Sequence, residues 1–317
     1  MSVPITFKPI YMERVWGGRG LEEKLNRELP PDKVIGESWE VVDRPEAQSV
    51  VESGQFAGLT LRQLLEESAG TIMGPIYSSK KPFPILIKWL DCQEKLSLQV
   101  HPPAQVAGKL EGEPKTENWY IADAEEGAEL MVGLKKGVTR ESFEKALKNN
   151  ELEPLVHKVG TAPGDSLFVW SGRIHAIGGG NFILEIQQNS DTTYRVYDWG
   201  RVGLDGKPRA LHVDESMESI EFEDFEPEPL RDTQPGDILA DCNEFRIRKE
   251  SVNKGKILTF PDMTQPVLVN VVSGEIEIKG KESTCFKRGD TILLPYTGDF
   301  DIAGLGDAVL LITDHFA

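Results

Sequence analysis

Short apolar runs separated by Gly, Pro, Asp and Asn dominate the hydrophobic pattern of this chain. Runs of this length and spacing are typical of the strands of β-sandwiches and β-barrels. The predicted strands are SVVES (49–53), PILIKWL (84–90), KLSLQVH (95–101), DSLFVW (165–170), FILEIQQ (182–188), VLVNVVSG (267–274), EIEIKG (275–280) and DTILLP (290–295). The pattern therefore predicts a mainly β protein.

Helical periodicity is confined to three places, at residues 59–68, 103–112 and 139–149. In the third, Thr139 is a good N-cap residue, and three apolar residues follow at the i, i+3, i+4 spacing of one helix face. These segments predict a few helices that decorate a β framework in the N-terminal half.

One pattern occurs twice along the chain. Gly164-Asp165 is followed by an apolar run, a bulky turn residue and then Gly172, and residues 289–298 repeat this order from Gly-Asp to Gly. Glycine accepts turn conformations that other residues resist, so each copy reads as turn, buried strand and turn. A chain of 317 residues has room for two domains.

The repeat predicts two domains of similar fold. The stretch 215–235 is acidic, contains proline and has mixed patterning, so we take it as the junction between them. We expect an N-terminal domain over residues 1–225, with the helical insertions, and a C-terminal domain over residues 226–317.

The charge of the chain excludes some classes of partner. Lys and Arg number 35 against 52 Asp and Glu, which gives a net charge of −17. Such a field repels the phosphate backbone of nucleic acids and anionic lipid surfaces. We expect neither as a partner, and a bound phosphorylated metabolite would need a local group of Lys or Arg.

The cysteines and the N-terminus suggest a compartment. Cys92, Cys242 and Cys285 lie far apart and form no CxxC pair, which predicts neither a disulfide framework nor a thiolate zinc site. Proline and charged residues interrupt the first 18 residues, so they do not form a signal peptide. No apolar window reaches the ~18 residues of a spanning helix. These features favour a reducing cytoplasm.

Candidate chemistry begins in the segment 95–101. Its residues alternate, so that Ser97, Gln99 and His101 share one face of the predicted strand. A strand exposed on one side presents such a polar face to water, which is the simpler interpretation. However, two prolines end the strand directly after His101, and this places the imidazole at the strand mouth, where binding residues often lie.

Two further segments supply groups of the same kind. Lys115 and Glu117 share one face of an extended segment, which places a candidate oxygen ligand beside a cation. The simpler interpretation is an edge strand that exposes both charges to water. His175 follows a tight turn in a glycine-rich stretch, where the backbone allows close approach. Two imidazoles, one carboxylate and an amide oxygen suit a borderline divalent ion, zinc first and other first-row metals after it. The lack of cysteine favours a catalytic site.

The turn before His175 carries a family resemblance. Gly164, five residues, and then Trp170-x-Gly172-x-x-His175 resembles the second cupin motif, with Trp in place of Pro. The resemblance implies a fold of two cupin-type (jelly-roll) β-barrel domains. The C-terminal copy has Asp301 where the motif has histidine, so we expect that domain to be metal-free.

The first cupin motif is similar to Gln99-x-His101 with the distant Glu117, Gln replacing the first histidine. Within cupins, the chain resembles the short bacterial form of type I phosphomannose isomerase over nearly its whole length. The segments that carry this resemblance are ERVWGG (13–18), GESWE (36–40), LSLQVHP (96–102), KTE (115–117) and GRIHA (172–176). It implies a zinc-dependent interconversion of mannose 6-phosphate and fructose 6-phosphate, with one zinc ion per chain.

The resemblance also implies roles for individual residues. The implied zinc ligands are Gln99, His101, Glu117 and His175. Arg195 falls at the position of the family's catalytic arginine. Ser97 and Lys115 flank ligand residues on the same strand faces and are expected to contact phosphate or sugar.

An aldose–ketose isomerase moves a proton between C1 and C2 through an enediolate, so it needs oxyanion stabilisation and a base. The planar, permanently charged fork of Arg195 suits the first task and not the second. A metal-bound hydroxide, a carboxylate or a histidine could be the base. Two other classes remain open: a sugar-binding cupin without turnover, and a cupin oxygenase, which would use iron and usually His-x-His. The sequence predicts no oligomeric state.

Overall fold

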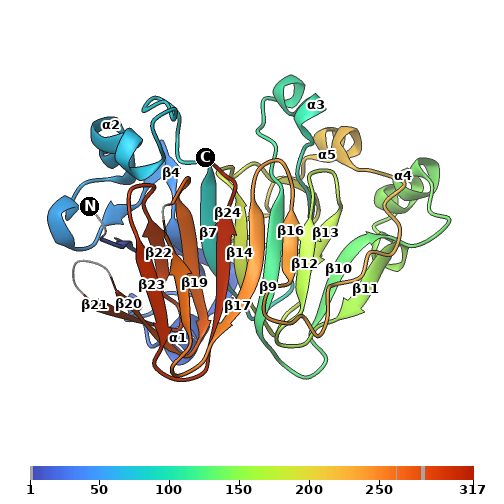
Figure 1. The fold of residues 1–317 in the computed structure, drawn as a ribbon. Helices are drawn as coiled ribbons and strands as arrows, with labels where there is room; N and C mark the ends of the chain where they lie inside the picture. The colour runs from blue at the N-terminus through green and yellow to red at the C-terminus, as the bar shows by residue number, and fades with distance from the viewer. Residues whose placement is uncertain (1–2, 262, 280–282) are drawn as a thin grey trace. The chain divides into compact units, whose positions relative to one another are not determined.

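Strands are the main regular structure of the protein, and the helices are short (Figure 1). The computed structural model describes residues 3–261, 263–279 and 283–317. Each predicted strand segment contains a strand, which confirms the mainly β prediction; the last residue of the segment 275–280 lies outside the described residues.

The chain forms two compact units, each built from more than one segment. Unit 1 comprises Met1–Ile10, Ser38–Trp89 and Asp232–Ala317, and unit 2 comprises Tyr11–Glu37 and Leu90–Arg231. The predicted junction at 215–235 contains one change of unit, between Arg231 and Asp232. The units are not the continuous domains 1–225 and 226–317, because N-terminal segments cluster with the C-terminal residues.

The helices lie close to the predicted positions. They are α1 (Gly20–Leu25), α2 (Leu61–Ile72), α3 (Ala104–Ala107), α4 (Arg140–Lys148) and α5 (Val213–Ser219), with 3-10 turns η1 (Gly54–Phe56), η2 (Gly108–Leu110) and η3 (Glu153–Leu155). The predicted N-cap of α4 is confirmed: the Thr139 hydroxyl accepts from the Ser142 amide in a capping box. Two helices, α1 and α5, were not predicted.

Unit 2 contains the candidate chemistry and has two sheets. The first has the order β11-β10-β13-β8-β15, with β8 (Leu98–Val100), β10 (Glu129–Leu134), β11 (Val156–Gly160), β13 (His175–Ile177) and β15 (Tyr194–Tyr197). The second has the order β12-β9-β14-β7-β3-β2, with β2 (Ile10–Gly18), β3 (Ile35–Val41), β7 (Ile85–Cys92), β9 (Glu117–Ala124), β12 (Ser166–Val169) and β14 (Asn181–Gln188). Along the chain, β3 and β7 pass from one unit into the other.

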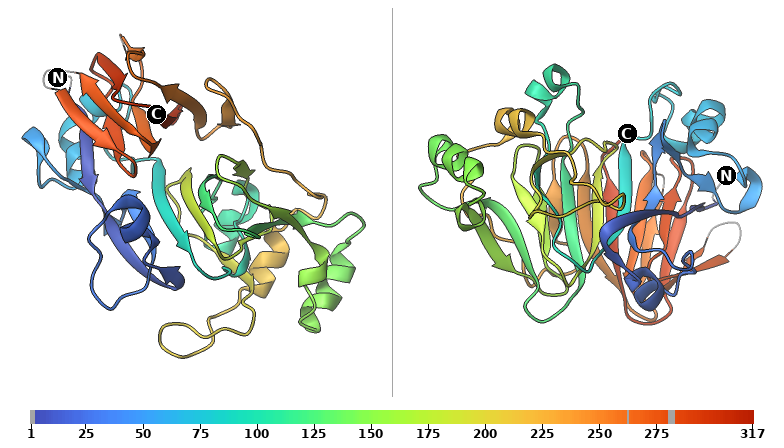
Figure 2. Two further views of the ribbon diagram at one scale, coloured as in Figure 1. Left: turned by 90° about the horizontal axis from the view of Figure 1, so that it is seen from below. Right: turned by 180° about the vertical axis from the view of Figure 1, so that it is seen from behind.

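Apolar clusters lie on both faces of the five-stranded sheet. On one face, Leu98 of β8 packs in a cluster with Phe143 of α4 and Met217 of α5. These two helices (green and gold) lie on the same side of the unit in both views of Figure 2. On the other face, Val132 of β10 shares a cluster with Trp119 of β9, a strand of the second sheet. The second face is therefore the interior of the barrel.

Unit 1 is also a β structure, with two larger sheets and one two-stranded sheet. One sheet has the order β16-β17-β24-β19-β22-β1-β6 and the other β18-β23-β20-β21, and β4 (Asp43–Arg44) pairs with β5 (Ala47–Gln48). The remaining bounds are β1 (Ile5–Lys8), β6 (Val50–Val51), β16 (Ile238–Asp241), β17 (Arg246–Val252), β18 (Ile257–Phe260), β19 (Val267–Ser273), β20 (Glu275–Lys279), β21 (Ser283–Lys287), β22 (Thr291–Leu294), β23 (Phe300–Gly304) and β24 (Ala308–Asp314). An apolar cluster that includes Val269, Ile278, Phe300 and Ile312 fills this unit.

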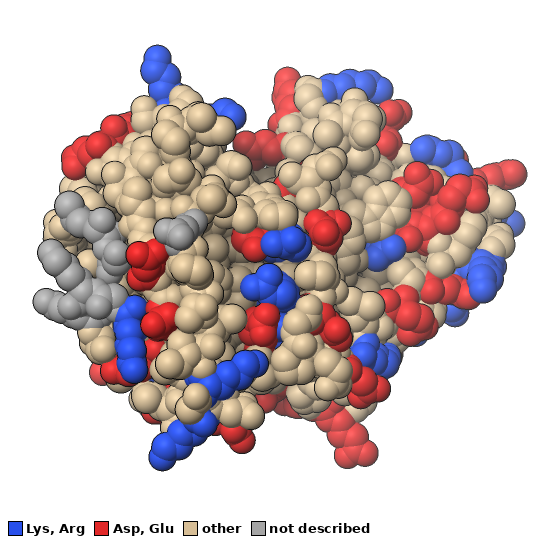
Figure 3. All heavy atoms as spheres, in the orientation of Figure 1, with Lys and Arg blue, Asp and Glu red and all other residues tan. Residues whose placement is uncertain are grey.

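The cysteines, the length of the helices and the surface charges complete the description of the chain. All three cysteines are free. Among the described residues, no helix is both long and apolar enough to cross a membrane. On the face drawn in Figure 3, Lys and Arg side chains are interspersed with Asp and Glu.

Candidate metal centre

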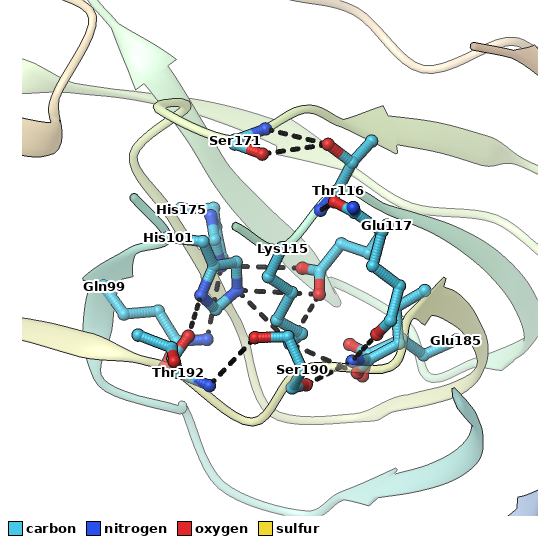
Figure 4. Close-up of polar contacts among 12 residues, drawn as sticks. Gln99, His101, Lys115, Thr116, Glu117, Ser171, His175, Glu185, Ser190 and Thr192 are labelled. Carbon is cyan, nitrogen blue, oxygen red and sulfur yellow. Dashed lines mark hydrogen bonds and ion pairs between the residues drawn. The ribbon is translucent and has the colours of Figure 1, made fainter. Parts of the chain in front are cut away.

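Three buried side chains from different strands of unit 2 meet inside its barrel (Figure 4). His101 follows β8, Glu117 begins β9 and His175 begins β13. One ligand atom of each lies within 4.8 Å of the others. The sequence therefore predicted correctly that these three residues converge.

The strand registers explain this convergence. His175 lies opposite Val132 in the β10–β13 pair and opposite Gln99 in the β8–β13 pair. Paired residues of adjacent strands project from the same face. Because Val132 faces the barrel interior, His175 and Gln99 do so as well. Glu117 reaches the same space from the second sheet.

A glycine turn fixes the approach of the β13 segment. Gly172 has φ +102°, a conformation that glycine adopts without strain. Its amide donates to the carbonyl of His101 at 2.8 Å, so the turn before β13 is tied directly to the end of β8. The glycine of the second cupin motif therefore connects the segments that carry the two histidines.

Backbone carbonyls orient both imidazoles. Nδ1 of His101 lies 2.8 Å from the carbonyl of Thr192, and Nδ1 of His175 lies 2.8 Å from the carbonyl of Arg173. A carbonyl only accepts, so each Nδ1 carries the hydrogen and each Nε2 keeps its lone pair. Both lone pairs belong to atoms that face Glu117, with Nε2–Oε distances of 3.5 Å from His101 and 3.6 Å from His175. Metal-binding histidines commonly have this arrangement.

Burial keeps these imidazoles neutral. It lowers the pKa of His175 to about 3, with a smaller contribution from His101 nearby. Burial also lowers the pKa of His101, and the Lys115 ammonium lowers it further. Neutral imidazole is the form that binds a metal ion.

The carboxylate of Glu117 is ionised and has acceptor capacity to spare. Burial favours its neutral form, but the Lys115 ammonium more than offsets this and holds the pKa of Glu117 well below its ordinary value. Neither oxygen has a hydrogen bond to any residue in the described ranges. The Lys115 ammonium lies 2.6 Å from Oε2 as an ion-pair partner. A cation between Glu117 and the imidazoles would satisfy these oxygens, so the residues fit a metal ion.

Gln99 lies beside this group. Its Nε2 lies 3.2 Å from Nε2 of His175, and its Oε1 accepts from the Ser97 hydroxyl at 3.4 Å. Rotation of the amide by 180° exchanges the two atoms, and a hydroxyl can either donate or accept. Gln99 can therefore turn its oxygen toward a metal ion and keep its contact with Ser97, which is itself buried.

Lys115 is a buried cation beside the candidate ligands. Its ammonium lies 2.6 Å from Glu117, 3.8 Å from Glu185 and 3.3 Å from Nε2 of His101. Burial opposes its charge, but the two carboxylates more than offset this, and the pKa of Lys115 is raised. Lys115 is therefore a fixed positive charge rather than a proton acceptor.

Arg195 lies next to the group on the adjacent strand. It is directly opposite Gln99 in the β8–β15 pair, so its side chain leaves the same face of the sheet. One guanidinium nitrogen donates to the carbonyl of Ala210 at 2.7 Å. Nε is buried and has no hydrogen bond to a described residue. Burial, and then Arg209 nearby, lowers the pKa of Arg195.

Some residues of the site were not predicted. Glu185 accepts from the indole of Trp119 at 2.9 Å and lies near Lys115. A single acidic residue in the apolar run 182–188 was the available signal. Thr192 and Arg173 act through backbone carbonyls, which every residue has, so their side chains gave no signal.

The fold and the buried His–Glu–His group define a cupin-type protein with a candidate metal site. The structure superimposes on that of the mannose 6-phosphate isomerase from Bacillus subtilis with a TM-score of 0.89, at 30% identity over 99% of this chain and 100% of the other. A phosphomannose isomerase from Salmonella typhimurium shares the fold at a TM-score of 0.77, with 14% identity, 99% of this chain and 100% of the other.

The sequence comparisons identify the family. Residues 5–145 match the model of the type I phosphomannose isomerase catalytic domain. The chain is 37% identical to the Bacillus subtilis mannose-6-phosphate isomerase, over 97% of this chain and 98% of the other, and 34% identical to that of Streptococcus mutans, over 94% of each. The chain belongs to the type I phosphomannose isomerase family of enzymes.

Proposed function

We propose that this protein interconverts mannose 6-phosphate and fructose 6-phosphate through an enediolate, with one zinc ion per chain. The relatives that carry the name mannose-6-phosphate isomerase match it over nearly their full length, which supports the substrate. The proposed zinc ligands are Gln99, His101, Glu117 and His175.

The observation that carries this proposal is the donor set at Glu117. Two neutral imidazoles turn their unprotonated nitrogens toward a buried carboxylate that lacks hydrogen bonds within the described structure. Without cysteine, such a set suits a catalytic rather than a structural zinc ion. A bound zinc ion would supply Lewis-acid polarisation of substrate oxygens.

The other residues of the site have distinct proposed roles. Arg195 keeps its charge and presents a planar fork, so it would donate to the oxyanion that develops during proton transfer. Lys115 holds its positive charge beside Glu117 and would contact the sugar or its phosphate, as would Ser97. Ser97 also supports the Gln99 amide, so it has a second role in orienting a ligand.

The chemistry of the substrate and of the cysteines suggests a cytoplasmic setting. A sugar phosphate is a small anion, and a protein with net charge −17 must bind it through local Arg and Lys. The three cysteines are free, and a reducing compartment keeps them so. We therefore propose a cytoplasmic enzyme whose partner is a small sugar phosphate rather than nucleic acid or membrane.

The test is a coupled isomerase assay on mannose 6-phosphate, before and after thorough chelation. We expect activity to disappear with the metal and to return with stoichiometric zinc, and elemental analysis to give about one zinc per active chain. Magnesium added instead of zinc is the control. Activity that survives complete metal removal would contradict the zinc mechanism. Substrate binding without turnover by the zinc-loaded protein would instead indicate a sugar-binding cupin.

A further inference from the structure

A buried glutamine beside the candidate metal centre uses only half of its amide. Gln187 lies on β14, directly opposite Glu117 of β9, and is fully buried. Its Nε2 donates to the carbonyls of Gln188 and Ser190, both at 2.7 Å. Its Oε1 has no hydrogen bond to any residue that the structure describes. Carbonyls only accept, so the orientation of this amide is fixed.

An unpaired buried acceptor is unfavourable, and an apolar side chain of the same shape would avoid it. What glutamine adds at this position is two donors that point into the loop after β14. The presence of Gln187 is therefore explained by the need to hold residues 188–190 from the inside.

This loop reaches His101. The Ser190 hydroxyl accepts from the amide of Thr192 at 3.2 Å and donates to the carbonyl of Glu113 at 3.4 Å. The Thr192 hydroxyl accepts from the amide of Glu113 at 3.0 Å. The Thr192 carbonyl then accepts from Nδ1 of His101. Figure 4 shows Ser190 and Thr192 beside the imidazole of His101. A continuous set of contacts therefore joins Gln187 to a candidate ligand.

The same loop reaches the segment before Glu117. The side-chain oxygen of Gln188 accepts from the backbone amide of Thr116 at 2.8 Å. The backbone amide of Gln188 donates to the carbonyl of Thr116 at 3.0 Å. Thr116 directly precedes Glu117. The loop 188–192 is therefore in contact with the segments that carry two of the candidate ligands.

We propose that Gln187 is a positioning residue of the metal centre. Its amide fixes the loop 188–192, so that the Thr192 carbonyl holds His101 with Nε2 toward Glu117 and Gln188 holds the start of β9. Gln187 does not bind the ion. This inference rests on the proposed function, because it needs a metal ion at the centre. It extends that function to a residue outside the proposed ligand and substrate set.

The test compares zinc affinity between matched variants of the full chain, by competition with a chromophoric chelator. Gln187→Met keeps the shape, removes both donors and also removes the unpaired oxygen. We expect its zinc dissociation constant to rise about tenfold, within the range seen when outer supports of metal ligands are changed. We expect its thermal midpoint to fall no further than that of the control variant Asn181→Leu, so that a loss of zinc affinity beyond the control separates positioning from a purely structural role.

Asn181→Leu is the matched control. Asn181 is also buried on β14, and its amide donates to the carbonyls of Glu129 and Gly178. It lies six residues from Gln187, or roughly 20 Å along an extended strand. We expect Asn181→Leu to lower the thermal midpoint and leave zinc affinity unchanged.

Each outcome decides a different point. If Gln187→Met binds zinc as tightly as the unsubstituted chain, this inference is overturned and the proposed function is not. The same holds if Asn181→Leu loses as much zinc affinity as Gln187→Met. An unsubstituted chain that takes up no zinc would overturn the proposed function and this inference with it. Should Gln187→Met fail to fold, Ser190→Ala is compared with Asn181→Leu instead, because it removes the next contact toward Thr192 and Glu113.

Discussion

Gln99 and Arg195 lie directly opposite each other on β8 and β15, and His175 lies opposite Gln99 on its other side. The three side chains therefore form one row across the interior face of the sheet. Gln99 and His175 are proposed ligands, whereas Arg195 stands at the end of the row and is held by the carbonyl of Ala210. This arrangement allows Arg195 to contact substrate without contacting the ion.

Replacement of Arg195 by alanine should therefore separate turnover from metal binding. We expect kcat on mannose 6-phosphate to fall about 10²–10³-fold, the usual cost of removing one oxyanion donor. Zinc content should stay the same. Arg231→Ala, an exposed ion-pair partner of Asp165 in the same unit, is the control and should keep full activity. Loss of zinc in proportion to activity would show that Arg195 is structural.

The carbonyl that holds Arg195 depends on a buried aspartate. Asp198 accepts from Arg209 Nε at 2.7 Å and from Arg201 Nη2 at 2.9 Å. Arg209 directly precedes Ala210, so Asp198 fixes the position of the Ala210 carbonyl. We expect Asp198→Asn to lower kcat about tenfold without loss of zinc, because a small misplacement of a catalytic group is costly.

Asp205→Asn is the matched control for this loop. Asp205 is exposed and accepts from the backbone amide of Lys207. Steady-state kinetics of both variants, together with elemental analysis, test the idea. A kcat for Asp198→Asn equal to that of Asp205→Asn would show that this aspartate does not position Arg195.

The sequence predicted strands well where the apolar runs were long and local. It missed the pairing of β1 with β22, in which Ile5 lies opposite Leu293. A strand of four residues carries little periodicity, and its partner lies near the other end of the chain. That pairing is one reason why N-terminal residues belong to unit 1. Helix α5 was also missed, because its acidic sequence matched the pattern of a junction.

The candidate site was predicted as far as residue chemistry allows. His101, Glu117 and His175 were recognisable because few side chains bind metal ions, and their convergence is confirmed. The ligand role of Gln99 and the catalytic role of Arg195 stay predictions. The supports of the histidines are backbone carbonyls, whose positions depend on the folded loops and not on residue type.

The buried pair of Lys115 and Glu117 predicts a specific pattern of stability in the metal-free chain. Removal of one partner of a buried ion pair leaves an uncompensated charge and costs about 3–5 kcal/mol. Lys115 has a second carboxylate, Glu185, at 3.8 Å, whereas the other ion-pair contacts of Glu117 in the described part of the chain are to neutral imidazoles. We therefore expect Lys115→Met to destabilise the fold more than Glu117→Gln.

Urea unfolding of the chelated single and double variants measures this coupling. The double variant should be destabilised by less than the sum of the two single variants. The same cycle on the exposed pair Lys109–Glu218 is the control and should give no more than about 1 kcal/mol. Additive effects at Lys115 and Glu117 would contradict the ion pair.

The pKa values of the two histidines predict how the stability of the metal-free chain depends on pH. Burial lowers the pKa of His175 from 6.5 to about 3 and also lowers that of His101. Below about pH 6.5 the unfolded chain binds protons that the folded chain does not, so stability falls as pH decreases toward 3. Each histidine contributes up to about 1.4 kcal/mol per pH unit to this slope. Urea midpoints of the chelated protein between pH 7 and pH 5 should therefore decrease, and His175→Asn should reduce the slope. The control is His315→Gln, which changes an exposed histidine and should leave the dependence of stability on pH as it is. If His175→Asn also leaves that dependence unchanged, His175 is protonated in the folded chain.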